Sequence, residues 1–295
     1  MRIAKLFCLV LVTACAPGPH SLRIDPALAT LVPADAIALA GIRIDKLTRS
    51  PLYRDLRPLL DTNLVSRLTR RTGRRLGDLW ELLAVATPED IVWMARGRFS
   101  ASGIEPRLTW PGARRATYRN HLFISDARQA VSFMNASTAL AGRPERIKAI
   151  IDQRDSEAAP PADLLALAGE IDDSAQIWAV VLGGRKPPPG VLEPLRRLLE
   201  DILPKIERAR AAVKVGETLA LNVEAECRNL DDAETLRSAA NAFLGFTRLQ
   251  RNEGPALREA LDRLSVQREG ALVKLTVELP APLVKKLLPI QKPAS

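Results

Sequence analysis

Apolar and polar residues alternate over several short stretches of the chain, a pattern typical of β-strands that bury one face. The clearest example is residues 264–279, where a Glu269-Gly270 turn separates two alternating runs and predicts a hairpin. The same criteria predict further strands over residues 36–45, 82–86, 91–99, 118–124, 130–134, 138–141, 176–182 and 219–227.

Other segments repeat apolar residues at helical spacing. Ser50-Pro51 has the residue types of an N-cap and a first helical position, and a leucine stripe follows from residue 52 to residue 68, with a break expected at Pro58. Asp231 with Glu234 resembles a capping box and predicts a helix through residue 244. Further helices are predicted over residues 143–152, over residues 192–206 with a kink near Pro204, and from Pro255.

These elements predict an α+β fold. The order strand, long helix, strand, strand occurs in both halves of the chain, which favours two tandem α+β units with antiparallel sheets, loosely ferredoxin-like. A polar stretch with two prolines, residues 154–163, separates the halves. The predicted organisation is a signal peptide (1–14), a lipidated tether (15–33), a first α+β half (34–153) and a second α+β half (164–290).

The first fifteen residues have the layout of an export signal. Arg2 and Lys5 precede a short apolar core, residues 6–13, which is too short to span a bilayer. The run Val12-Thr13-Ala14-Cys15 resembles a bacterial lipobox, in which a branched apolar residue and two small residues precede the cysteine that receives the lipid. That resemblance implies that Cys15 is joined to a diacylglycerol and becomes the first residue of the mature protein.

Two other interpretations of this segment stay open: a secretory signal with an incidental cysteine, or a short buried helix. If Cys15 is acylated, two or three chains hold the protein at a membrane, because one chain alone gives only reversible attachment. We therefore expect a protein of the bacterial cell envelope, facing the periplasm or the exterior. Ala16, rather than Asp, follows the cysteine, and by analogy with the sorting rule of some bacteria this favours the outer membrane.

A second resemblance concerns the body of the protein. Residues 133–142, FMNASTALAG, are followed by a helix that leads into Ile-Asp at residues 151–152. This pattern resembles uncharacterised envelope lipoproteins of bacteria, and the resemblance implies no known activity.

Candidate chemistry is sparse. The chain holds two histidines, His20 and His121, and none of the common nucleophile, zinc, redox, phosphate or dinucleotide motifs. The adjacent carboxylates at 172–173 and 231–232 are interpreted as turn or cap residues. Cys227 lies on the apolar side of its strand and is expected to be a buried, inert thiol. We predict no catalytic residue, no cofactor and no metal site, which favours a protein that is not an enzyme.

The charge balance suggests a different kind of site. The full chain carries a net charge of +9, and removal of Arg2 and Lys5 leaves +7. Arginines suit phosphate groups through their planar fork, so two clusters are predicted to bind anionic lipids or envelope polymers. These clusters are Arg67, Arg70, Arg71, Arg74 and Arg75, and Arg114, Arg115 and Arg119. The alternative is a solvated surface, with cations placed favourably at a helix C-terminus.

Three functional hypotheses follow. The first is a lipid-anchored envelope protein with a non-catalytic binding or assembly role, whose partner is the membrane and also an anionic envelope polymer or another envelope protein. The second is an envelope-polymer hydrolase or transferase that uses a carboxylate near Arg119 or His121. The third is an anionic-surface module built on the first arginine cluster. Nucleic acid is not expected as a partner, because the protein is exported and only 4% of its residues are aromatic.

Overall fold

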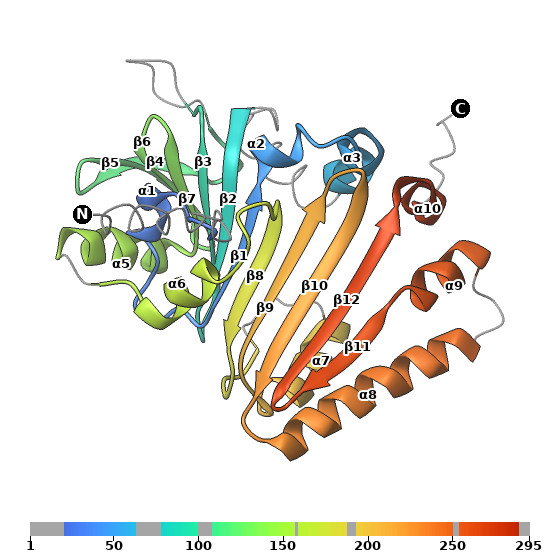
Figure 1. Ribbon diagram of the computed structural model, residues 1–295. Coiled ribbons are helices and arrows are strands. Elements are labelled where there is room, and N and C mark those ends of the chain that lie inside the picture. Colours follow the sequence, from blue (N-terminus) through green and yellow to red (C-terminus); the bar gives the residue numbers. More distant parts are fainter. Residues whose placement is uncertain are drawn as a thin grey trace, which may run out of the picture.

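The computed structural model describes residues 21–62, 78–99, 108–156, 159–187, 193–249 and 254–288. In this part of the chain, twelve strands form one antiparallel sheet in the order β11-β12-β10-β9-β8-β1-β2-β3-β7-β6-β5-β4 (Figure 1). The predicted α+β class is confirmed.

The strands are β1 (Ala38–Arg43), β2 (Leu79–Ala86), β3 (Ile91–Gly97), β4 (Arg114–Tyr118), β5 (His121–Ser125), β6 (Ala130–Asn135), β7 (Thr138–Gly142), β8 (Ile177–Leu182), β9 (Ile206–Val215), β10 (Thr218–Cys227), β11 (Ser265–Glu269) and β12 (Leu272–Pro280). The helices are α1 (Pro26–Ala29), α2 (Ile44–Leu47), α3 (Tyr53–Thr62), α5 (Pro144–Asp155), α6 (Ala162–Gly169), α7 (Glu193–Ile202), α8 (Leu230–Leu249), α9 (Pro255–Asp262) and α10 (Ala281–Leu287).

The sheet contains two five-stranded units with the same topology. The first unit has the order β1-β2-β3-β7-β6, and the second has the order β8-β9-β10-β12-β11. Their first strands, β1 and β8, pair antiparallel and join the units into one sheet. In each unit, a strand and a helix precede a hairpin, and a second hairpin follows an insertion, which is β4–β5 in the first unit and α8–α9 in the second. The two tandem units expected from the sequence are therefore present.

The ferredoxin-like comparison is wrong in its strand order. A ferredoxin-like unit is a split β-α-β, in which strands joined by a helix are not adjacent and run parallel. Here β2 follows the helices after β1 and lies directly beside β1, and β9 lies directly beside β8. Every pairing between the described strands is antiparallel.

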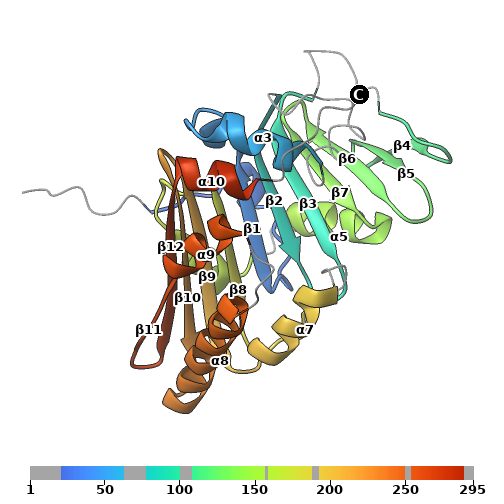
Figure 2. The same cartoon turned by 90° about the vertical axis from the view of Figure 1, so that its right-hand side faces the viewer.

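We name the two faces of the sheet after Leu83 and Leu82, adjacent residues of β2 whose side chains point to opposite sides. On the Leu83 face, the first unit buries its side chains beneath α1, α5 and α6, which form one large apolar cluster with it. On the Leu82 face, the second unit packs against α7 and α8 at one end and α10 at the other (Figure 2). The cluster on the Leu83 face contains residues from both sequence halves, so the predicted halves share a core.

The joint between the units is built around one glycine. Gly41 of β1 lies opposite Trp178 of β8, and the buried indole covers it. A β-carbon at Gly41 would lie 2.3 Å from two atoms of the Trp178 ring. Only glycine leaves room for the ring at this position, so the packing of the joint depends on Gly41.

Most predicted hairpins and helices are present, with three differences. Residues 118–124 do not form one strand, because Arg119 and Asn120 both adopt positive φ (47° and 64°) and make the tight turn between β4 and β5. The helix expected over 192–206 ends at Ile202, and Ile206 begins the unpredicted strand β9. Helix α3 continues through Pro58 without a break, and its predicted extension beyond residue 62 lies outside the described residues.

The predicted tether over residues 15–33 is too long, because residues 21–33 belong to the folded body. Leu22, Leu28, Leu31 and Val32 are buried in the core, since apolar side chains gain free energy by leaving water. The prolines in this segment are compatible with that packing, and Pro26 occupies the first position of α1.

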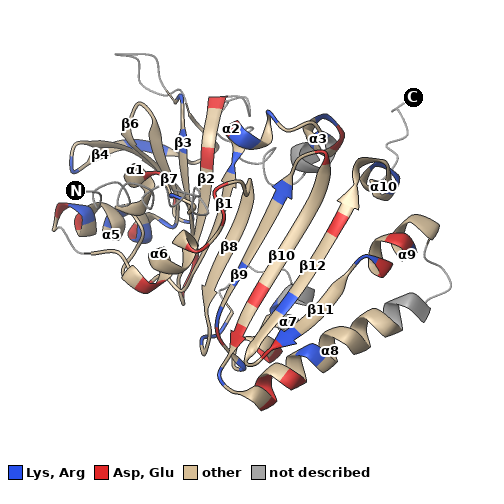
Figure 3. Ribbon diagram, viewed as in Figure 1, with Lys and Arg blue, Asp and Glu red and all other residues tan. Residues whose placement is uncertain are grey.

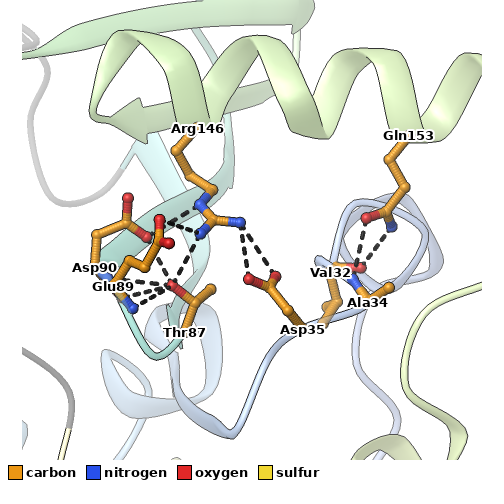
Figure 4. A network of polar contacts seen from close by, with 8 residues as sticks. All are labelled: Val32, Ala34, Asp35, Thr87, Glu89, Asp90, Arg146 and Gln153. Atoms are coloured by element: carbon orange, nitrogen blue, oxygen red, sulfur yellow. Dashed lines mark hydrogen bonds and ion pairs between the residues drawn. The ribbon is translucent and has the colours of Figure 1, made fainter.

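Polar contacts from α5 hold the end of this segment in place (Figure 4). The Gln153 amide donates to the Val32 carbonyl over 2.9 Å and accepts from the Ala34 N–H over 3.0 Å. Arg146 pairs with Asp35 over 3.0 Å and with Asp90, in the β2–β3 turn, over 3.2 Å. Residues 32–35 are therefore held against α5.

Candidate functional site

On the Leu83 face, helix α6 covers β8, and the neighbouring strands β9, β10 and β12 of the second unit carry charged side chains. Alternation along β9, β10 and β12 sends apolar side chains to the Leu82 face and charged side chains to the other. Figure 3 shows the charges along these strands. We call this surface the charged face; it comprises Arg208, Arg210 and Lys214 of β9, Glu224 and Glu226 of β10, Lys274 of β12, and Glu170 and Asp172 of the loop after α6.

Ion pairs cross this face from strand to strand. Arg208 contacts Glu226 over 2.6 Å and Glu170 over 3.0 Å. Arg210 contacts Glu224 over 2.5 Å and also pairs with Glu170.

Two further ion pairs extend this arrangement along the charged face. Lys214 pairs with Asp172 over 3.0 Å, and Lys274 pairs with Glu269 over 2.7 Å. The result is a set of charge columns that follow the strands: positive on β9, negative on β10, and positive again at Lys274.

Two adjoining hollows lie on the charged face. Their volumes are about 340 and 540 Å³, and Glu170, Arg210 and Glu224 line both. These volumes fall within the range of small-molecule sites, but the linings are rich in charge rather than apolar. All lining residues come from α6, the loop after it, and the second unit, so the surface suits a polar, charged partner.

Hydrogen bonds favour the ionised form of two carboxyl groups of this face, Glu224 and Asp172. Partial burial acts to raise the pKa of Glu224, but hydrogen bonds from Asn222 and Arg210 outweigh it and leave the pKa below its usual value. Hydrogen bonds from Ser174 and Lys214 lower the pKa of Asp172 to about 2. The charge columns therefore persist at neutral pH.

The N-terminal segment meets the body at the rim of this face. Ser21 forms an isolated antiparallel bridge with Asp172, and the Leu22 N–H donates to the Ile171 carbonyl over 2.7 Å. Asp172 pairs with Lys214 of the charged face.

A second polar cluster lies on β1, β2 and β3 of the first unit, at the edge of the Leu83 face that the helices cover. Arg96 pairs with Asp25 over 2.9 Å, and Arg43 pairs with Asp173 over 2.6 Å. Glu81 lies opposite both arginines in the strand register, and burial, together with the nearby Asp25 charge, raises its pKa to about 7.

The predicted arginine clusters are only partly described. Arg67, Arg70, Arg71, Arg74 and Arg75 lie outside the described residues, as does Cys15. Arg114 and Arg115 are exposed neighbours on β4, at the edge of the sheet, so they point to opposite faces and do not share one patch. Their binding of anions stays a prediction.

Arg119 and His121 both lie near the C-terminal end of α5. Arg119 pairs with Asp152 over 3.3 Å, and Asp152 also accepts a 2.8 Å hydrogen bond from the Tyr118 hydroxyl. His121 is half-buried, and burial, assisted by Arg154, lowers its pKa.

The adjacent carboxylates have structural partners. Asp172 accepts from the Ser174 N–H over 2.7 Å, as expected for a turn residue, while Asp173 pairs with Arg43 and Lys46. In the second pair, Asp231 and Asp232 lie in the first turn of α8, whose Asp232 N–H donates to Asn229 over 2.8 Å.

Cys227 is a free, buried thiol, as predicted, and burial raises its pKa. In the described part of the chain, no group of three or more His, Cys, Asp or Glu side chains is placed to hold a metal ion. None of the helices in the same residues is long and apolar enough to cross a bilayer.

Comparison of the chain with family models and with curated proteins finds no match. Among solved structures, the chain is similar to crystal form I of TP0453, with a TM-score of 0.51 and 8% identity, over 90% of this chain and 96% of that one. Crystal form III of TP0453 gives a TM-score of 0.50 and 7% identity, over 90% and 98%. These likenesses show a shared α+β fold.

The sequence pattern does not reveal the charged face. Residues 206–215, IERARAAVKV, alternate in polarity as expected for a strand, but Ile206 also continues the apolar stripe of the preceding helix. Even with β9 predicted, the pairing of Arg208 with Glu226 depends on the strand register.

Proposed function

We propose that this protein is a lipid-anchored component of the bacterial cell envelope with a non-catalytic binding role. Cys15 is its acylated residue, and the charged face is its binding surface. The observation that carries the second part is a hollowed, charged sheet face on β9, β10 and β12 with columns of both signs, next to the residue where the anchored segment joins the body.

The nature of the contacts supports binding rather than catalysis at this surface. Each charged group already has a partner of opposite sign, and several of these groups are well exposed, including Arg208 at 43% and Lys214 at 47%. Exposed ion pairs contribute little to stability, so their partners can be exchanged for those of a ligand. Ala16, after the acylated cysteine, makes the outer membrane the favoured location.

Palmitate labelling in a bacterial host tests the anchor. We expect the wild-type chain to incorporate the label and Cys15→Ser to lose it. Cys227→Ser is the matched control and should keep the label, because Cys227 is buried. Equal labelling of wild type and Cys15→Ser would remove the anchor from the proposal.

A further inference from the structure

We propose that the charged face docks on zwitterionic phospholipid headgroups, those of the membrane that holds the acylated Cys15. This inference rests on the proposed function, since it takes the lipid anchor as given. It adds the surface that meets the membrane and the chemistry that this surface recognises.

The length of the anchoring segment limits where the membrane can lie. Ser21 is paired with Asp172 at the rim of the charged face, and Ser21 is the sixth residue after Cys15. Even fully extended, six residues span about 20 Å. The rim of the charged face is thus held within that distance of the headgroups.

The spacing of the charge columns fits a headgroup with two opposite charges. Neighbouring strand backbones lie about 4.8 Å apart, and the cations of β9 and the carboxylates of β10 form parallel columns whose facing groups contact each other over 2.5 to 2.6 Å. An ethanolamine headgroup carries a phosphate and an ammonium separated by two methylene groups, a distance of the same order as the strand spacing. Arginine suits the phosphate through its planar fork, and carboxylates accept hydrogen bonds from the ammonium.

The balance of charge favours a zwitterionic surface over an anionic one. Arg263 adds a further cation and Glu278 a further carboxylate at the edge of the larger hollow. Four cations and six carboxylates therefore line the hollows, and an anionic surface would repel the carboxylates. A headgroup with both charges avoids this repulsion.

Lysine footprinting of the acylated protein on vesicles tests the orientation. Lys214 lies on the charged face, whereas Lys285 lies on α10, which packs on the other face, and their side chains are similarly exposed at 47% and 56%. On phosphatidylethanolamine-rich vesicles, we expect Lys214 to react about fivefold more slowly than in the unacylated Cys15→Ser chain, which corresponds to a ratio of docked to undocked protein of about four to one. Lys285 should react at the same rate in both.

Charge reversal tests the chemistry. Arg208→Glu should remove the protection of Lys214, because one exposed pair is worth up to about fivefold in binding. The matched control is Arg196→Glu on α7, whose side chain is equally exposed at 42% and also takes part in an ion pair. This control should leave the protection unchanged, and Arg208→Gln replaces the first variant if reversal prevents folding.

The outcomes separate the two proposals. If the acylated protein attaches to vesicles but Lys214 reacts as fast as in solution, the inference is overturned and the anchor stands. Stronger protection on phosphatidylglycerol vesicles than on phosphatidylethanolamine vesicles, with a steep loss in salt, would overturn the zwitterionic assignment in favour of an anionic surface. Absence of palmitate from wild-type protein would instead overturn the proposed function itself.

Discussion

The two units of the sheet place unlike residues at equivalent positions. Ala40 pairs with Ala179 at the centre of the joint, and counting outward from this pair aligns the units strand by strand. One row across the Leu83 face then contrasts three buried apolar residues of the first unit with three charged residues of the second. The first row is Leu83, Met94 and Leu140, and the second is Arg210, Glu224 and Lys274.

This difference decides where the helices pack. The helix that ends the first unit, α5, buries three isoleucines against the Leu83 face. The helix that ends the second unit, α10, packs on the opposite face, where Val284 meets Val215 and Leu279. Burying the charged row beneath a helix would cost several kcal/mol per ion, so the same backbone arrangement leaves one face covered and the other open.

The largest predicted effect breaks the joint on which the comparison depends. Gly41→Val places a branched side chain where the Trp178 ring lies, and we expect a loss of about 4 kcal/mol or more in the free energy of unfolding. Urea denaturation measures it. Gly169→Ala, where a β-carbon meets nothing within 4 Å, should change stability by less than about 0.5 kcal/mol. Equal losses in both variants would contradict the role of Gly41.

The second prediction compares equivalent positions in the two units. Met94→Ala leaves a cavity in the core and should cost about 3 kcal/mol. Glu224→Ala removes one partner of Arg210, which keeps Glu170, and should cost about 1 kcal/mol or less. The same denaturation assay checks both. If Glu224→Ala were as costly as Met94→Ala, the charged face would be a structural core.

The third prediction concerns Glu81, a carboxylate at the edge of the part of the Leu83 face that the helices cover. Burial raises the pKa of Glu81 to about 7, above its value of 4.5 in the unfolded chain. Between these values the folded protein holds a proton that the unfolded chain has lost, so stability falls as the pH rises from 4.5 through 7. The wild type should lose roughly 2 kcal/mol over this interval through Glu81.

Glu81→Gln mimics the protonated form and should remove this loss. We expect the variant to be more stable than wild type at pH 8 and similar to it at pH 4.5, as measured by denaturation at the two pH values. Glu259→Gln, an exposed change on α9, serves as the control and should match wild type at both. If the free energy of unfolding changed with pH in the same way in wild type and in Glu81→Gln, Glu81 would be ionised in the folded protein, contrary to this prediction.

The fold class, most hairpins and the repeated order of elements can be predicted from the amino-acid pattern, because period-two alternation and turn residues act over a few neighbours. The same alternation predicted the burial of Cys227 on the apolar side of its strand. Where two local signals competed, it failed, as at Ile206, which continued a helical stripe but begins β9.

Which side chains meet depends instead on how the strands pair and pack. The pairing of Arg208 with Glu226 and Glu170, the position of Ser21 beside Asp172, and the cover of Trp178 over Gly41 join residues distant in sequence. Strand register and the choice of face set these contacts, and both follow from burying apolar area across the whole sheet. No local pattern contains that information, so the charged face became visible only once the strands were paired.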